Sequence, residues 1–332
     1  MMMSNSLKDF IIKHREKNIE DRKQRETKHN KKVASLQDRY FNNILDRIDA
    51  FYGKYTGKEG INSGLARKTV SKSEYERYFN RLRGLKDAHQ FTEIAKEEMN
   101  RNIVSPDVRR IDILSAEVTN ELIVMTNEEE LLHQEYMVDE VENDYLLEIF
   151  FIAGVASFLG RDKNKIDKYV QREKKNIPGK EKILRDTVNR DFLSAGWSER
   201  LWDNQDALRS ELDRIIRSGI SRGRNPKELA REIRKAFNSS KFNSERLLIT
   251  EMSRAQAMAQ EDSYKKNNFD EYEFHAEPTA CDVCAALDGE IFKVKDMEIG
   301  TNMYPIHPHC RCSTSPHMNR EAFEKDLESR GL

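Results

Sequence analysis

All four cysteines of the chain lie in one short segment that is rich in metal-binding residue types. The segment contains C-D-V-C and, after a gap, H-P-H-C-R-C. Close pairs of thiolates and an imidazole are typical ligands of a structural zinc site, which is tetrahedral and closed. A metal bound by Cys281, Cys284 and Cys310 has one further ligand, either His307 or Cys312, and the spacing does not decide between them.

Two disulfides are the competing interpretation of four cysteines. The N-terminal residues show neither the apolar core nor the cleavage site of a secretory signal, so we expect a reducing compartment, which favours a metal. The alternating patterns Y-E-F-H-A and E-I-F-K-V predict short strands around the cysteines. Asp288-Gly289 predicts a tight turn between the strands that carry the two pairs.

Enzymatic alternatives fit the same residues less well. A zinc deaminase needs H-x-E well upstream of P-C-x-x-C, whereas His275-Ala276-Glu277 lies too close to Cys281 and the proline is missing. A metal-dependent nuclease of the His-metal type would use His307 to activate water, but the second, widely spaced C-x-x-C pair is absent. The chain also lacks a Gly-rich phosphate loop and a G-x-S-x-G motif. We expect no catalytic residues and no enzymatic activity.

The cysteine segment resembles the C-terminal domain of tailed-phage minor head proteins, the Mu F-like head morphogenesis family. Its pattern is C-x-x-C followed by Leu-Asp-Gly and H-P-x-C-R-C, with an upstream helix that carries Arg and Thr-Glu. The chain has C-D-V-C-A-A-L-D-G, H-P-H-C-R-C and R-L-L-I-T-E-M-S-R-A, and the resemblance extends over about residues 195–316.

The resemblance implies a minor capsid protein that takes part in virion assembly. Such a protein would associate with the portal protein or the major capsid protein, act in the host cytoplasm during assembly and remain in the phage head. The resemblance also implies a role in packaging or delivering DNA. A DNA-binding scaffold unrelated to phage is a further alternative.

Charged residues are separated into blocks along the chain. Nine Lys/Arg oppose four Asp/Glu in residues 11–32, and ten oppose four in residues 161–185, whereas residues 111–160 hold twelve acidic residues and no Lys or Arg. The basic blocks, together with residues 209–235, could neutralise phosphates in sequence-independent, salt-sensitive binding of double-stranded DNA. The alternative is an ordinary solvated surface. The acidic block suits a basic protein partner or the chain's own block at 161–185.

The remaining patterns predict a mainly α protein in two parts. Residues 1–150 form an elongated helical region, and residues 151–332 form an α/β domain with a small zinc-stapled β-element. Residues 13–32 predict an exposed helix or a disordered arm, Asn225-Pro226 caps a helix, and another helix is expected from Ser244 to about Lys266. The apolar run from Tyr145 to Gly160 is too short to span a membrane, so we expect a buried helix and no membrane partner.

Thr250-Glu251 has no chemistry assigned by spacing. A buried ion pair, with Arg246 as the nearby cation, would hold its helix against the zinc element. A catalytic carboxylate is the alternative, but no partner acid or base stands at a useful spacing.

Overall fold

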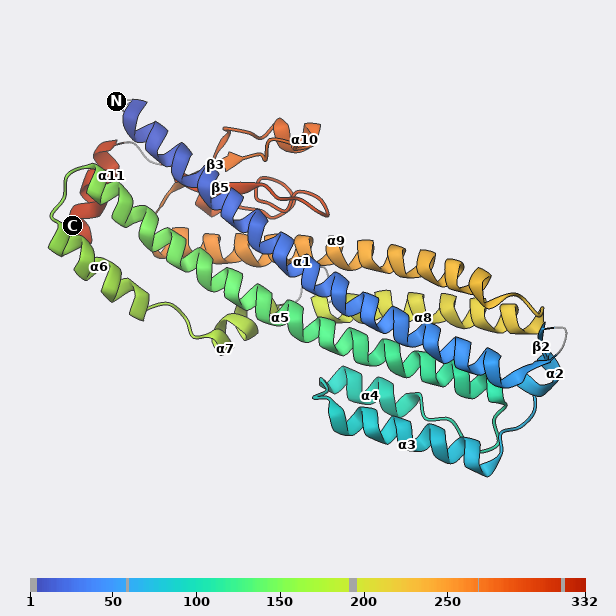
Figure 1. Ribbon diagram of the computed structural model, residues 1–332. Coiled ribbons are helices and arrows are strands. Elements are labelled where there is room, and N and C mark those ends of the chain that lie inside the picture. The colour runs from blue at the N-terminus through green and yellow to red at the C-terminus, as the bar shows by residue number, and fades with distance from the viewer. Residues whose placement is uncertain (1–4, 58–59, 191–195, 268, 318–319) are drawn as a thin grey trace. The chain divides into compact units, whose positions relative to one another are not determined.

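The computed structural model of the protein describes residues 5–57, 60–190, 196–267, 269–317 and 320–332. Most of these residues are helical, as the sequence predicts (Figure 1). The helices are α1 (Asn5–Tyr55), α2 (Ser63–Ala66), α3 (Lys72–Ala88), α4 (Glu93–Arg101), α5 (Arg110–Phe158), α6 (Lys163–Lys175), α7 (Lys180–Ile183), α8 (Trp197–Ser221), α9 (Pro226–Lys266), α10 (Asp282–Ala285) and α11 (Arg320–Ser329). A π-helical turn, Leu184–Val188, follows α7, and a 3-10 turn, Val294–Asp296, follows β4. None of the helices in the described ranges could cross a membrane.

The strands form two small antiparallel sheets. β1 (Thr56–Gly57) pairs with β2 (Gly60–Ile61). The second sheet has the order β4-β3-β5, with β3 (Glu271–His275) between β4 (Ile291–Lys293) and β5 (Ser313–His317). The strands predicted around the cysteines correspond to β3 and β4, whereas β5 carries no alternating pattern that predicts it.

The chain divides into two compact units that are each built from several segments. Unit 1 comprises residues 1–29, 133–197 and 246–332, and unit 2 comprises residues 30–132 and 198–245. The long helices α1, α5 and α9 each contribute residues to both units. The division into 1–150 and 151–332 stays a prediction, because the observed units are not continuous in sequence.

Unit 2 is mainly helical, with only the short strands β1 and β2 among its described residues, and it has an apolar core. Residues such as Ile44, Tyr78, Leu122, Leu212 and Ile233 are almost fully buried there. The helix ends are capped by side chains: Ser71 and Glu74 form a capping box at α3, and the Asn225 side chain accepts from the Lys227 N–H at the start of α9, as predicted.

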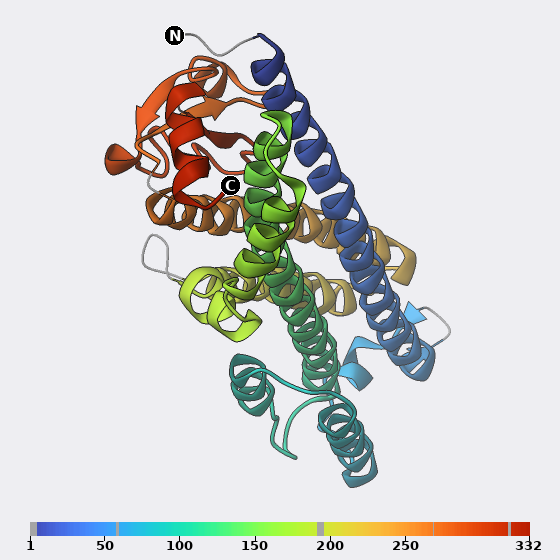
Figure 2. The same ribbon diagram turned by 90° about the vertical axis from the view of Figure 1, so that its left-hand side faces the viewer.

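Unit 1 packs helices against the three-stranded sheet. Tyr272 and Phe274 of β3 are fully buried, and Phe323 of α11 lies against Phe269 just before β3. Figure 2 shows the C-terminal helix α11, in red, beside the orange strands of this sheet. The same core includes Cys284, Cys310 and Cys312. Three of the four cysteines are therefore part of the core of unit 1, whereas Cys281 is exposed.

One expected helix boundary is absent, and the helix alternative for residues 13–32 is confirmed. The helices expected to begin at Pro226 and at Ser244 are one continuous α9, because no Gly or Pro interrupts the segment after Pro226. Residues 13–32 are helical within α1, and part of this segment is covered, since Arg25 donates to the buried carboxylate of Glu140 at 2.5 Å.

Acidic residues of α5 pair mainly with arginines of the same unit. In unit 2, Glu128, Glu121, Glu117 and Asp112 meet Arg39, Arg47, Arg81 and Arg217, respectively. In unit 1, Lys180 bonds to Asp139 at 2.6 Å and is the one described residue of the 161–185 block that makes an ion pair with α5. The acidic block is thus largely neutralised within the chain.

Candidate metal centre

The first cysteine pair lies on the short helix α10. Cys281 is the residue before the helix, and Cys284 is within it, so both belong to the connection between β3 and β4. This connection ends in the Asp288-Gly289 turn, where Asp288 accepts from the Ala276 N–H at 2.9 Å and Gly289 has φ 78°. The predicted turn exists, but the strands do not carry the cysteine pairs, because both pairs lie outside the sheet.

The second pair lies in the loop before β5 and is held by α9. The Ser253 hydroxyl donates to the Cys310 carbonyl at 2.7 Å, and the Thr250 hydroxyl accepts from the His309 N–H at 2.9 Å. His309 has φ 69°, a left-handed conformation uncommon for residues other than glycine. Two hydroxyls on α9, three residues apart, therefore fix the backbone that presents His307 and Cys310.

The N-terminal helix completes this support. Arg22 donates to the Arg311 carbonyl at 3.4 Å, and the Arg311 guanidinium bonds to Glu26 at 2.6 Å. Both contacts lie within unit 1. Residues of the basic segment of α1 thus bind and stabilise the cysteine loop.

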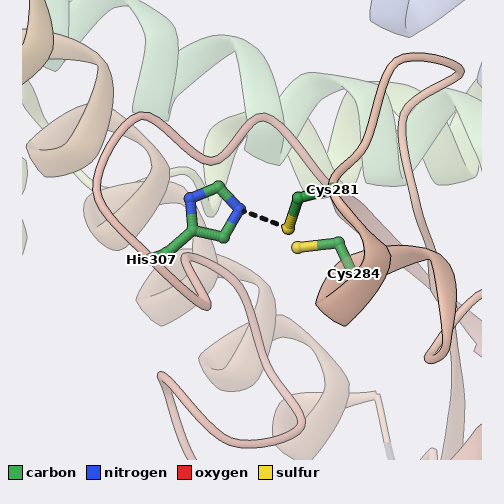
Figure 3. A group of neighbouring side chains, drawn as sticks. All are labelled: Cys281, Cys284 and His307. Carbon is green, nitrogen blue, oxygen red and sulfur yellow. Dashed lines mark hydrogen bonds between the residues drawn. The ribbon is translucent and has the colours of Figure 1, made fainter.

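The five predicted ligands come together in two overlapping groups of three. Cys281, Cys284 and His307 form one group, and Cys284, Cys310 and Cys312 form the other; within each group all ligand atoms lie within 4.8 Å. The His307 Nε2 lies 3.3 Å from the Cys281 Sγ, with Cys284 beside them (Figure 3). The Sγ atoms of Cys284 and Cys310 are 3.9 Å apart.

The distance between Cys284 and Cys310 fits one edge of a tetrahedral metal site. Sulfurs bound to zinc at about 2.3 Å are about 3.8 Å apart along one edge of the tetrahedron, close to the separation of Cys284 and Cys310. The same separation is far from a disulfide bond, and all four cysteines are free. The cysteine and histidine groups could hold a metal ion.

The electrostatics differ between the exposed and the buried end of the site. At the exposed end, the Cys284 N–H donates to Cys281 and lowers the pKa of that thiol, while the bond from the His307 Nδ1–H to the Pro308 carbonyl raises the pKa of the imidazole. At the buried end, a hydrogen bond from Cys312 lowers the pKa of Cys310 to about 5. The same bond and burial raise the pKa of Cys312.

Glu251 makes the buried ion pair that the sequence suggested, but with another partner. Its carboxylate accepts from the Arg254 Nε at 2.8 Å, and both side chains are buried, whereas Arg246 is exposed. Arg254 also donates to the Val188 carbonyl. The pair therefore fastens α9 to the π-helical turn of unit 1.

Residues 210–315 match the model of a known family. The family is described as Phage Mu protein F like protein. This segment covers about a third of the chain, includes all five candidate ligands and confirms the resemblance inferred from the cysteine pattern. No match was found among the curated proteins or the solved structures.

The sequence predicted the candidate ligands but not all of the residues that hold their loops in place. Thr250 was noticeable as part of Thr-Glu, and Ser253 lies one turn further on the same helix face. Arg22 and Glu26 are also one turn apart, but nothing in the sequence links them to Arg311. His275 of the accidental H-x-E pattern bonds to Ser315 at 2.7 Å and belongs to neither ligand group.

Proposed function

We propose that the protein is a minor capsid protein of a tailed phage that acts in head morphogenesis. The observation that carries the proposal is the Mu F-like match over residues 210–315, which coincides with the cysteine element and its supporting helix α9. The protein would join the procapsid in the host cytoplasm through the portal protein or the major capsid protein and stay in the virion. This is an interaction role and needs no catalytic residue.

Co-assembly tests this role directly. The chain would be expressed with the portal and major capsid proteins of its own phage, and procapsids would be separated from free protein by sedimentation. We expect the chain to sediment with heads, and omission of the portal protein or of the capsid protein identifies the partner. Failure to sediment in the complete mixture would contradict the proposal.

The metal in this proposal is Zn²⁺ in a structural site formed by Cys281, Cys284, His307 and Cys310. In this set, the His307 Nε2 lies 3.3 Å from the Cys281 Sγ, and the Sγ atoms of Cys284 and Cys310 are 3.9 Å apart. Both distances suit edges of a tetrahedron of ligands. The His307 Nδ1–H donates to the Pro308 carbonyl, the kind of contact that orients metal-binding histidines. Cys312 would then remain a thiol beside Cys310. A bound ion would crosslink the connection between β3 and β4 to the loop before β5.

Elemental analysis distinguishes the ligand sets. We expect about one zinc per chain in the unmodified protein and in Cys312→Ala, and loss of zinc in His307→Ala. The opposite pattern would assign Cys312 as the fourth ligand. Absence of zinc from protein purified without chelator would contradict the site as a whole.

We further propose that the element is not a nuclease. Four protein ligands would leave no open position for water, and an open position is what zinc catalysis requires. Incubation of the chain with supercoiled plasmid and Mg²⁺ should leave the plasmid intact. Nicking that disappears in His307→Ala would favour the nuclease alternative.

Contact with double-stranded DNA is proposed for α6. The arginines of the other basic segments include several that are held in ion pairs or backbone contacts, such as Arg22, Arg25 and Arg217. In contrast, five lysines of α6 are exposed and form no ion pair with any residue in the described ranges: Lys163, Lys165, Lys168, Lys174 and Lys175.

Salt dependence provides the test. Each lost phosphate contact reduces the slope of log K against log salt by about 0.9. Changing Lys163, Lys165 and Lys168 to Gln should therefore reduce the slope, whereas the same change at Lys72, Lys96 and Lys325 should not. Equal slopes in both triple variants would contradict the role of α6.

A further inference from the structure

Glu148 differs from most acidic residues of α5. Its Oε1 atom is buried and has no hydrogen-bond partner among the described residues. The positive charge that acts on it most strongly is that of Arg330, but this guanidinium is held by Asp326 at 2.6 Å and by Asn267 at 2.7 Å. Glu148 is thus a half-buried residue with one buried carboxylate oxygen that is unpartnered among the described residues, and the cation that acts on it most strongly bonds elsewhere.

The Glu148 side chain lines a cavity of about 520 Å³ within unit 1. The cavity, which we call the amine pocket, is bounded by α5, α6, α7 with the π-helical turn, and the C-terminal end of α9. A volume of this size lies in the range of small-molecule sites. A second cavity of about 100 Å³ meets the same Glu148 from the side of α1.

The walls of the amine pocket combine apolar and anionic surface. Ile149, Ile152 and Ile177 supply aliphatic contacts, and the rings of Tyr145 and Tyr169 line the same space. At the rim, Asp262 is a further carboxylate without an ion pair in the described part of the chain. Such a lining suits a ligand with an aliphatic stem and a cationic end, which a carboxylate and aromatic faces both attract.

We propose that the amine pocket binds an alkylammonium group, with Glu148 as its counter-ion. The ligand would be either the lysine side chain of a partner protein or a free aliphatic diamine, since both present the same stem and the same charge. Two rim lysines, Lys182 and Lys266, do not satisfy the site in the structure, because neither donates to Glu148 in the described contacts. The binding is independent of the metal centre and of the head-assembly proposal.

Burial gives this binding a dependence on pH. Desolvation raises the pKa of Glu148 to about 7. An ammonium ligand, which remains charged below pH 10, binds the ionised carboxylate, so about a tenth of the sites are ready at pH 6 and about nine tenths at pH 8. Apparent affinity should therefore increase about tenfold between these values. Among the groups that face the cavities around Glu148, those closest to titrating in this range are Asp144 and His14.

Ligand-observed NMR titration of the full-length chain tests the proposal. The probes are Nα-acetyl-lysine methylamide, 1,5-diaminopentane and the Nε-acetylated, uncharged form of the lysine probe. We expect both amines to bind at pH 8, to weaken about tenfold at pH 6 and to weaken at least tenfold in Glu148→Gln. Glu135→Gln, which neutralises an exposed acid of the same helix, should bind like the unmodified chain.

The relative strength of the two amines identifies the source of the ligand. Tighter binding of the lysine probe supports a protein side chain, and tighter binding of the diamine supports a free amine. The proposal is overturned if neither amine binds, if the uncharged probe binds equally well, or if Glu148→Gln retains full affinity. Zinc content and far-UV circular dichroism of both variants establish that they are folded.

Discussion

The two units of the protein depend on different kinds of interaction. Unit 2 has a continuous apolar core. Four acidic side chains of α5 form ion pairs in this unit, with Arg39, Arg47, Arg81 and Arg217. Unit 1 instead buries three thiols in its core and leaves Glu148 without a hydrogen-bond partner among described residues. Unit 2 therefore depends on apolar packing and internal ion pairs, whereas the described part of unit 1 places potential metal-binding groups and an unpartnered carboxylate oxygen in its interior.

Removal of the metal should produce the largest difference between the units. Structural zinc contributes on the order of 10 kcal/mol in small zinc domains, so Cys284→Ser should destabilise unit 1 by several kcal/mol. Hydrogen exchange measured by mass spectrometry should show loss of protection in residues 271–317, while residues 111–132 keep theirs. Equal loss in both regions would mean that the metal does not act locally.

A cavity introduced into unit 2 should destabilise unit 2 and leave unit 1 unchanged. Leu212 is fully buried, and Leu→Ala changes at such sites cost about 2–5 kcal/mol. Leu212→Ala should lower the free energy of unfolding of unit 2, seen as faster exchange in residues 201–220, and leave the zinc content at about one per chain. Loss of zinc in this variant would contradict the separation of the two kinds of stability.

Replacing Glu148 by an uncharged residue should stabilise unit 1 by an amount that depends on pH. The pKa of Glu148 is about 7 in the folded chain and near 4.5 in the unfolded one, so its burial costs stability as pH rises from about 4.5 to 7 and the full cost remains above that. Glu148→Gln should therefore raise the free energy of unfolding by roughly 1 to 3 kcal/mol at pH 8 and change it little at pH 4. Thermal unfolding at both pH values measures this, with Glu135→Gln as control.

Surface ion pairs should matter least in either unit. Lys325 and Glu321 are 3.1 Å apart on α11, and both side chains are about three quarters exposed. Lys325→Ala should change the free energy of unfolding by less than about 0.5 kcal/mol, because solvent screens such pairs. A larger change in urea unfolding would show that α11 supports unit 1 more strongly than its exposed charges suggest.

The sequence by itself predicted most of the helical structure and the cysteine and histidine residues that could hold a metal ion. The apolar run from Tyr145 to Gly160 predicted the helix that forms the end of α5, Asn225-Pro226 predicted the start of α9, and close spacing identified the candidate ligands. These features depend on local geometry: hydrogen bonds three or four residues apart and ligands on the same short loop. Local rules did not predict β5, because a strand at a sheet edge is defined by its partner β3 and not by its own pattern.

Only the tertiary structure decided which distant groups meet. Arg22 and Glu26 bond to Arg311 in the Cys310–Cys312 loop, although they are far from it in the sequence. Glu251 forms its ion pair with Arg254, whereas the sequence suggested Arg246. Likewise, twelve acidic residues in one block look alike in the sequence. Burial and the presence or absence of a facing arginine separate them, and both depend on how helices pack. That is why Glu148 becomes a candidate binding group only in the folded protein.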